Sequence, residues 1–197
     1  MIRVLAFAGF LAGLSASTLL AQEDTADAPQ YQDGNALVFP QDYRSWPFAG
    51  TGLGLTYEEG GVPRAEENPR FSHVFVNPTA YAQFMETGQW PDRTVFVLEF
   101  RESASEVSIN ESGFFATDLA ALEAEVKDSR FDDGWAYFRF GNSTSGFLDL
   151  AQPLSTEEAA PCVQCHSDHG AVERTFVQFY PTLFEVAREK GTVKPNY

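Results

Sequence analysis

The two cysteines of the chain lie three residues apart, and a histidine directly follows the second one: Cys162-Val163-Gln164-Cys165-His166. Side chains three and four positions apart share one face of a helix, so both thiols and the imidazole can meet one planar ligand. The spacing C-x-x-C-H is typical of c-type haem attachment. We therefore predict one covalent haem c, held by Cys162 and Cys165, with His166 as the iron ligand.

Two other chemistries use a C-x-x-C pair. Structural zinc needs four ligands of this kind. The sequence has no second C-x-x-C pair, and its H-x-x-H pair, His166 and His169, belongs to the same short stretch and brings no ligands from elsewhere in the chain. A disulfide or a dithiol redox couple stays open as the alternative, because an oxidising compartment favours the first and thioredoxin-like proteins use the second.

The amino-terminal segment has the pattern of a secretory signal peptide. Arg3 precedes an apolar run that ends near Leu14, and small residues lead to Ala21. The apolar run is too short for a comfortable membrane span, although an uncleaved anchor is the alternative. We predict a signal peptide at residues 1–21, with Ser17 as the other cleavage point, and hence a periplasmic protein without stable membrane insertion.

Composition narrows the class of partner. The chain has 13 Lys and Arg residues against 28 Asp and Glu residues, for a formal net charge of -15 at pH 7. Nucleic acid and anionic membrane surfaces bind positively charged faces, so neither is an expected partner. A small neutral ligand and a basic redox partner protein are both compatible with this charge.

The chain after the signal peptide is long enough for one domain with its own core. Residues 22–35 are polar and acidic, and we predict a flexible lead-in there. Residues 36–197 show no internal repeat, and we expect them to form a single mono-haem domain.

Local patterns predict an α+β fold: mainly antiparallel sheet with peripheral helices and a C-terminal helical segment for haem attachment. Three runs rich in aromatic or β-branched residues and bounded by turn residues predict strands, at residues 71–76, 94–100 and 135–140. Proline at the start and glycine after the end predict a helix over 78–87. Residues 119–126 fit a strand or a helix equally. From Ala159 onward the pattern is helical, and the last helix begins at Pro181.

Six short runs occur in an order that is specific, although each alone is weak: residues 39–46 (FPQDYRSW), 76–81 (VNPTAY), 87–95 (TGQWPDRTV), 126–131 (VKDSRF), 162–166 (CVQCH) and 176–181 (FVQFYP). Together they resemble the cytochrome P-460 family and the related beta-type cytochromes c-prime, over roughly residues 39–187. The resemblance implies a mostly antiparallel β fold, a homodimer, and a c-type haem whose iron keeps an open axial position. Some members oxidise hydroxylamine, and others bind nitric oxide on an apolar distal face.

One departure from the family bears on activity. Members named for hydroxylamine oxidation carry a lysine bonded to the haem edge, and the resemblance places Leu98 at that position. Leucine cannot form the cross-link, so the cross-linked type of hydroxylamine oxidation is not expected. Lys127 could replace the lysine only through a shifted register, and it lies in a run that matches another family segment.

The resemblance also implies a glutamate in the haem pocket, and Glu123 falls at that position. A carboxylate in an apolar pocket has a raised pKa and can accept a proton from a bound N–H or O–H group. We therefore take Glu123 as the candidate catalytic residue. The alternative is a solvated glutamate on an amphipathic strand.

The far side of the iron needs either a sixth ligand or an apolar cap. His73 and Met85 are the candidate ligands, although a partly exposed strand histidine and a core methionine are the plainer interpretations. His169 shares a helical face with His166 and is better interpreted as a neighbour than as a ligand. Five aromatic side chains are candidates for the cap, although most of them are expected to be ordinary hydrophobic core: Phe71, Phe75, Phe96, Phe114 and Phe115.

We therefore expect an exported mono-haem cytochrome with an open iron site that binds or converts nitric oxide or hydroxylamine. Whether it acts as an enzyme is left open, because Leu98 replaces the family lysine. The alternative is a periplasmic electron-transfer cytochrome with a sixth protein ligand, which keeps the iron coordination constant between oxidation states.

Overall fold

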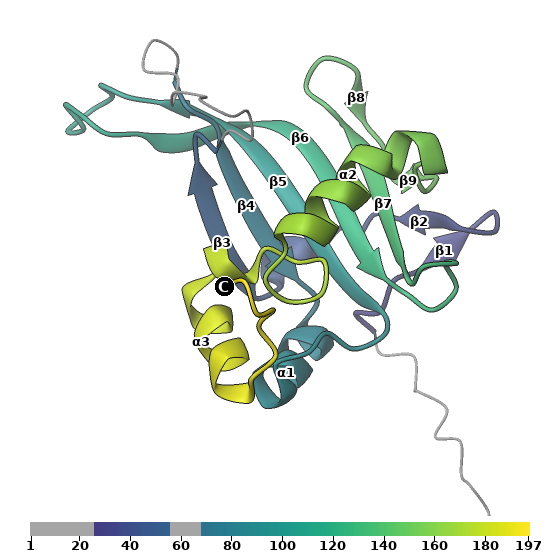
Figure 1. Cartoon of the computed structure of the whole chain (residues 1–197). Helices are drawn as coiled ribbons and strands as arrows, with labels where there is room; N and C mark the ends of the chain where they lie inside the picture. The colour runs from purple at the N-terminus through teal and green to yellow at the C-terminus, as the bar shows by residue number, and fades with distance from the viewer. Residues whose placement is uncertain (1–25, 56–67) are drawn as a thin grey trace, which may run out of the picture.

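A computed structural model describes residues 26–55 and 68–197. The predicted signal peptide, residues 1–21, and the first part of the predicted lead-in lie outside the described residues. The described residues form two antiparallel sheets and three α-helices (Figure 1). The predicted α+β class with a mainly antiparallel sheet is confirmed.

The larger sheet holds six strands in sequence order, each antiparallel to the next. Its strands are β3 (Phe48–Leu53), β4 (Phe71–Val76), β5 (Thr94–Ala104), β6 (Phe115–Lys127), β7 (Trp135–Asn142) and β8 (Gly146–Phe147). Successive side chains of a strand point to opposite faces of the sheet. This alternation decides which residues reach the site and which reach the core.

Two of the helices carry the start and stop signals expected from the sequence. Helix α1 (Pro78–Thr87) begins at a proline and ends before Gly88, which has a φ of 71°. Helix α3 (Pro181–Lys190) ends before Gly191 in the same left-handed conformation, which glycine adopts without a steric penalty. The two helices lie together at one end of the sheet (Figure 1).

Helix α2 (Thr156–His169) crosses one face of the larger sheet (Figure 1). It begins with a capping box: the Ser155 hydroxyl accepts the backbone N–H of Glu158, and the Glu158 carboxylate accepts the backbone N–H of Ser155. This reciprocal pair satisfies two N–H groups that a helix start leaves unpaired. The predicted attachment motif therefore lies on a helix whose first turn is held by this capping box.

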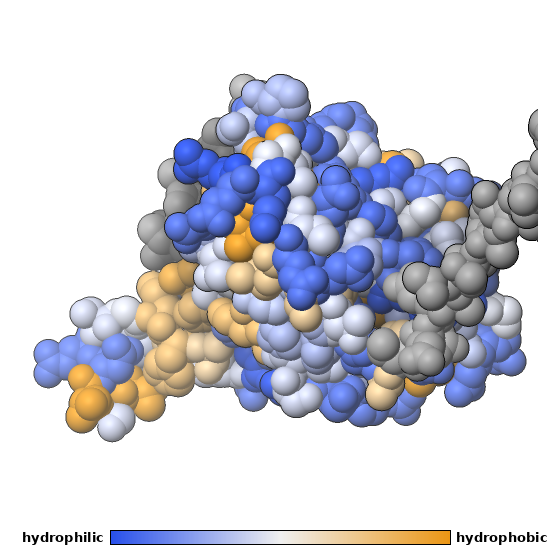
Figure 2. Space-filling model, turned by 90° about the horizontal axis from the view of Figure 1, so that it is seen from below, coloured by the Kyte–Doolittle hydropathy of each residue, from blue (hydrophilic) through white to orange (hydrophobic). Residues whose placement is uncertain are grey.

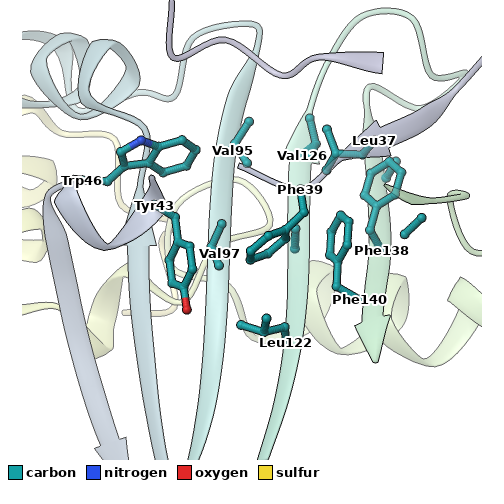
Figure 3. Packing of buried hydrophobic residues seen from close by; sticks show 13 residues of the cluster. Leu37, Phe39, Tyr43, Trp46, Val95, Val97, Leu122, Val126, Phe138 and Phe140 are labelled. Carbon is teal, nitrogen blue, oxygen red and sulfur yellow. The ribbon is translucent and has the colours of Figure 1, made fainter. Parts of the chain in front are cut away.

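The opposite face of the larger sheet carries the main core. A small sheet covers it, formed by β1 (Tyr31–Gln32), β2 (Ala36–Val38) and β9 (Leu150–Ala151), together with the short 3-10 helix η1 (Tyr43–Ser45). Figure 3 shows Phe39 and Tyr43 lying against Val97 and Phe140. The Phe39 and Phe140 ring centroids are 4.8 Å apart, so aromatic packing joins the small sheet to the large one.

Part of the predicted flexible lead-in is packed on the domain. Strand β1 pairs with β2, and the Tyr31 hydroxyl donates a hydrogen bond to Asp128 over 3.0 Å. The Arg130 guanidinium lies 3.7 Å from the centre of the Tyr31 ring. Residues 26–35 thus make long-range contacts with the domain that their polar composition does not indicate.

Two other local predictions are resolved by the structure. Residues 119–126 belong to strand β6, not to a helix. The chain between α2 and α3 is not continuously helical, since it leaves α2 at Gly170, turns back, and forms only the 3-10 helix η2 (Val177–Phe179) before α3. The turn brings the chain after Gly170 back against α2, so that the Arg174 carbonyl oxygen lies beside His166.

The loop between β5 and β6 projects from the body of the molecule (Figure 1). Exposed apolar side chains belong to it and to the start of β6: Val107, Ile109, Phe114 and Phe115. Figure 2 shows apolar colour on the projecting part and where it joins the body. No helix among the described residues has the length and apolar character needed to cross a bilayer.

Candidate haem site

Helix α2 and the larger sheet enclose a mostly apolar cavity of about 350 Å³. Strands β4 and β5 form the wall opposite the helix with Val74, Phe96, Leu98 and Phe100, and the chain after α2 adds Phe176 and Phe179. Pockets that bind cofactor-sized ligands have volumes of about 300–1,000 Å³. The cavity therefore has the size and the lining of a cofactor site.

The predicted attachment motif faces this cavity. Cys162, Cys165 and His166 all line it, as three-and-four spacing on one helical face requires. Both cysteines are free thiols, and burial raises the pKa of the Cys162 thiol. Two thiols and one imidazole on one side of an apolar cavity fit a covalently attached haem.

A bare metal ion fits the site less well. Among residues 26–55 and 68–197, no three His, Cys, Asp or Glu side chains are grouped so that they could hold an ion. Structural zinc requires four such ligands. The donor set at the cavity therefore matches an iron porphyrin, which brings four of its own nitrogen ligands.

The second nitrogen of His166 is held by the backbone. Its Nδ1 atom lies 2.8 Å from the carbonyl oxygen of Arg174, and a carbonyl can only accept a hydrogen bond. Nδ1 therefore carries the proton, which leaves the lone pair of Nε2 for a metal. Gly170 makes this contact feasible, since a Cβ atom there would lie 2.7 Å from the His166 carbonyl oxygen and 2.8 Å from the Arg174 carbonyl carbon.

Ion pairs anchor the segment that carries this carbonyl group. The Lys127 ammonium group donates to the Glu173 carboxylate and to the Trp90 carbonyl oxygen, both over 2.6 Å. The Arg174 guanidinium donates to Asp133 over 2.8 Å. Lys127 is thus held outside the cavity lining, which agrees with the prediction that it does not replace the family's cross-linking lysine.

Leu98 and Glu123 are direct partners across strands β5 and β6, and both line the cavity. Oε1 of Glu123 lies 3.7 Å from Nε of Arg139, and 42% of the Glu123 side chain is exposed. Burial raises the pKa of Glu123, and the positive charge of Arg139 partly offsets this rise. Glu123 therefore stands at the edge of the cavity, and its role as a proton acceptor stays a prediction.

The structure does not support the candidate sixth ligands. His73 pairs with Glu99 of β5 and stacks on Phe71 at 5.7 Å between ring centroids, on the sheet face opposite the cavity, and burial lowers its pKa. Met85 packs in the core around α1. His169 is exposed at the end of α2. Strand alternation explains the position of His73, because Val74 and not His73 points toward α2.

Most of the five candidates for the apolar cap lie away from the cavity. Of the five candidates only Phe96 lines the cavity. Phe75 packs against Tyr43 in the core on the other face, and Phe114 and Phe115 are 44% and 40% exposed. Phe100, which shares the face of Phe96 at period two, takes part instead, and the alternation along β5 was a signal that could have identified it.

Several polar residues at the cavity were not predicted, among them Glu125 and Tyr137. These two line it because they lie on the same face as Glu123 on strands β6 and β7. The alternation of residues 122–127 (LEAEVK) could have placed Glu125 beside Glu123. It could not show that this polar face is covered by α2 and not by water.

A C-x-x-C-H helix that closes an apolar cavity against an antiparallel sheet defines a haem-binding cytochrome of the β-sheet class. Comparison with known protein families narrows this class. The model of the Cytochrome P460 family matches residues 40–177, which is more than half of the chain. The chain therefore belongs to the cytochrome P460 family, as its sequence resemblance predicted. No curated protein matches it.

Proposed function

We propose that this chain is an exported mono-haem c-type cytochrome that binds or converts small nitrogen oxides, with Cys162 and Cys165 attaching the haem and His166 as its axial ligand. Haem supplies an iron that binds such ligands and exchanges electrons with them. The proposal rests on the composition of the cavity wall that faces α2, whose described residues offer the iron no second protein ligand. Among the described residues that line the cavity there is no histidine besides His166, and no methionine or lysine.

The apolar wall also favours one kind of ligand. Phe96, Leu98 and Phe100 offer no hydrogen-bond donor or acceptor from their side chains, so a small and weakly polar molecule such as nitric oxide loses little on leaving water. Two of the polar lining residues, Glu123 and Arg139, lie together at the cavity edge. Ligand binding and proton transfer are therefore assigned to different parts of the wall.

The test is the spectrum of the holoprotein produced in a host that matures c-type haem. We expect high-spin ferric and ferrous spectra and one nitric oxide bound per ferrous haem, measured by optical and electron paramagnetic resonance titration. A low-spin resting spectrum with no nitric oxide binding would instead support the electron-transfer alternative, and would require a ligand that the described lining residues do not provide.

Removal of the Glu123 charge is expected to separate binding from conversion. Glu123→Gln should slow hydroxylamine-dependent reduction of the ferric haem by about 10²–10⁴-fold, the usual contribution of a general base, and leave nitric oxide binding nearly unchanged. In the wild type the same rate should rise with pH through a pKa above the ordinary carboxyl value, because only ionised Glu123 accepts a proton. Stopped-flow reduction measures both effects.

Asp118→Asn is the matched control, since Asp118 is an exposed carboxylate on the same strand. Its reduction rate should equal that of the wild type. Equal rates for Glu123→Gln and the wild type would remove Glu123 from the reaction.

We also propose export to the periplasm, assembly as a homodimer and exchange of electrons with a redox partner protein. The signal-peptide pattern supports the first, and the family resemblance supports the second. Net negative charge favours a partner with a basic face. Cell fractionation and light scattering of the purified holoprotein test location and assembly directly.

A further inference from the structure

We propose that Glu125 is a positioning residue for His166 and controls how strongly this imidazole donates electrons to the haem iron. The inference rests on the proposed function insofar as it takes His166 as the axial ligand. It starts from one contact: Oε1 of Glu125 lies 3.1 Å from Nδ1 of His166. The Glu125 side chain is only 11% exposed, and within the described part of the chain this oxygen has no hydrogen bond.

Two acceptors thus compete for one N–H group. The hydrogen on Nδ1 is directed to the Arg174 carbonyl oxygen at 2.8 Å, and the Glu125 oxygen lies beside it from strand β6. Ion pairs of Glu173 and Arg174 hold the carbonyl in place, and the sheet holds the carboxylate. A small rotation of the imidazole would exchange one acceptor for the other, so His166 feels the negative charge in either orientation.

Among the described residues, no Arg or Lys forms an ion pair with Glu125 that would account for its burial. Glu99, on the opposite face, is buried between Arg44 and Arg101 and bonded to Tyr43. Among the ion pairs of the described residues, Glu125 instead has His166 as its partner. Burial of a carboxylate without a compensating cation costs free energy of folding. Such a cost is expected where the carboxylate has a functional role, here an action on the iron ligand His166.

Aromatic rings keep water away from the contact. The Tyr137 ring meets the His166 ring edge-on with centroids 5.1 Å apart, and the Phe176 ring meets it from 4.6 Å. Charges interact more strongly when water is excluded between and around them. The rings also limit how far the imidazole can rotate, so the carboxylate stays beside Nδ1 whichever acceptor takes the hydrogen.

A carboxylate at the outer nitrogen makes a ligating imidazole more basic. A more basic axial ligand stabilises ferric over ferrous iron and strengthens the bond from iron to histidine. Glu125 should therefore lower the reduction potential of the bound haem. Glu123 acts at the edge of the cavity, whereas Glu125 acts through His166.

The test compares holoprotein of the wild type, Glu125→Gln, Glu125→Asp and the control Asp118→Asn. Glu125→Gln keeps the shape and removes the charge, so the ratio of ferrous to ferric haem at a fixed potential should rise about tenfold, which is a rise in reduction potential of about 59 mV for one electron. Its iron–histidine stretching frequency should fall in resonance Raman spectra. Glu125→Asp keeps the charge and should lie between the wild type and Glu125→Gln, while Asp118→Asn should match the wild type.

An unchanged potential and stretching frequency in Glu125→Gln would overturn the proposal, and so would an equal shift in Asp118→Asn, which would indicate a general effect of net charge. If Glu125→Gln does not take up haem, Glu125→Asp decides: uptake and a near-normal frequency support the role of the charge, and equal loss contradicts it. Neither readout depends on nitrogen oxides. A wild type that fails to bind nitric oxide would reject the proposed function and leave this inference standing.

Discussion

The double variant Cys162→Ala, Cys165→Ala is expected to lose all of its haem on extraction with acidified acetone, whereas the wild type keeps its haem. Non-covalent haem leaves an unfolded chain, and only thioether bonds survive that treatment. Both thiols are free and line one cavity, and the sequence holds no further cysteine that could replace them. Absorbance of the extracted and precipitated fractions measures the effect.

Each single variant is the matched control, because one remaining thiol should keep one bond and most of the haem. The intact mass of the wild type should equal the mature polypeptide plus one haem, and peptides that contain Leu98 should be unmodified. Haem that extracts freely from the wild type would contradict the c-type assignment. A third bond to the haem would contradict the interpretation of Leu98.

Replacement of His166 should have the second largest effect. His166→Ala removes the imidazole that lines the cavity and donates a hydrogen bond from Nδ1 to the Arg174 carbonyl oxygen. The two thioether bonds would then retain the haem without its axial ligand. We expect loss of the wild-type high-spin spectrum and a severe loss of hydroxylamine-dependent reduction. Added imidazole, which can enter the space left by the side chain, should partly restore the spectrum.

His169→Ala is the control one helical turn away. His169 is exposed, and its contacts with Gln178 and Tyr197 use its backbone carbonyl oxygen, which the substitution keeps. The spectrum and the reduction rate should therefore equal those of the wild type. Loss of iron coordination in His169→Ala together with a normal His166→Ala would reverse the assignment of the ligand.

The sequence by itself determined those helices and strands whose start and stop signals lie within a few residues of their ends. Helix α1 has the predicted bounds and helix α3 begins at the predicted residue, because proline and glycine act within a turn of the helix end. Strand β4 also has its predicted bounds, residues 71–76. The C-x-x-C-H spacing placed Cys162, Cys165 and His166 on one helical face without any knowledge of the sheet.

Tertiary structure decided what those elements face. Strand alternation groups Glu123 with Glu125 and Phe71 with His73, but the sequence does not say which group α2 covers. Helix α2 covers the face that carries Glu123 and Glu125, so a face whose sequence suggests exposure to solvent lines a cavity. Phe71 and His73 lie on the opposite face of the sheet. The contact between Glu125 and His166 joins residues about forty positions apart, and only the packing of α2 against β6 brings them together.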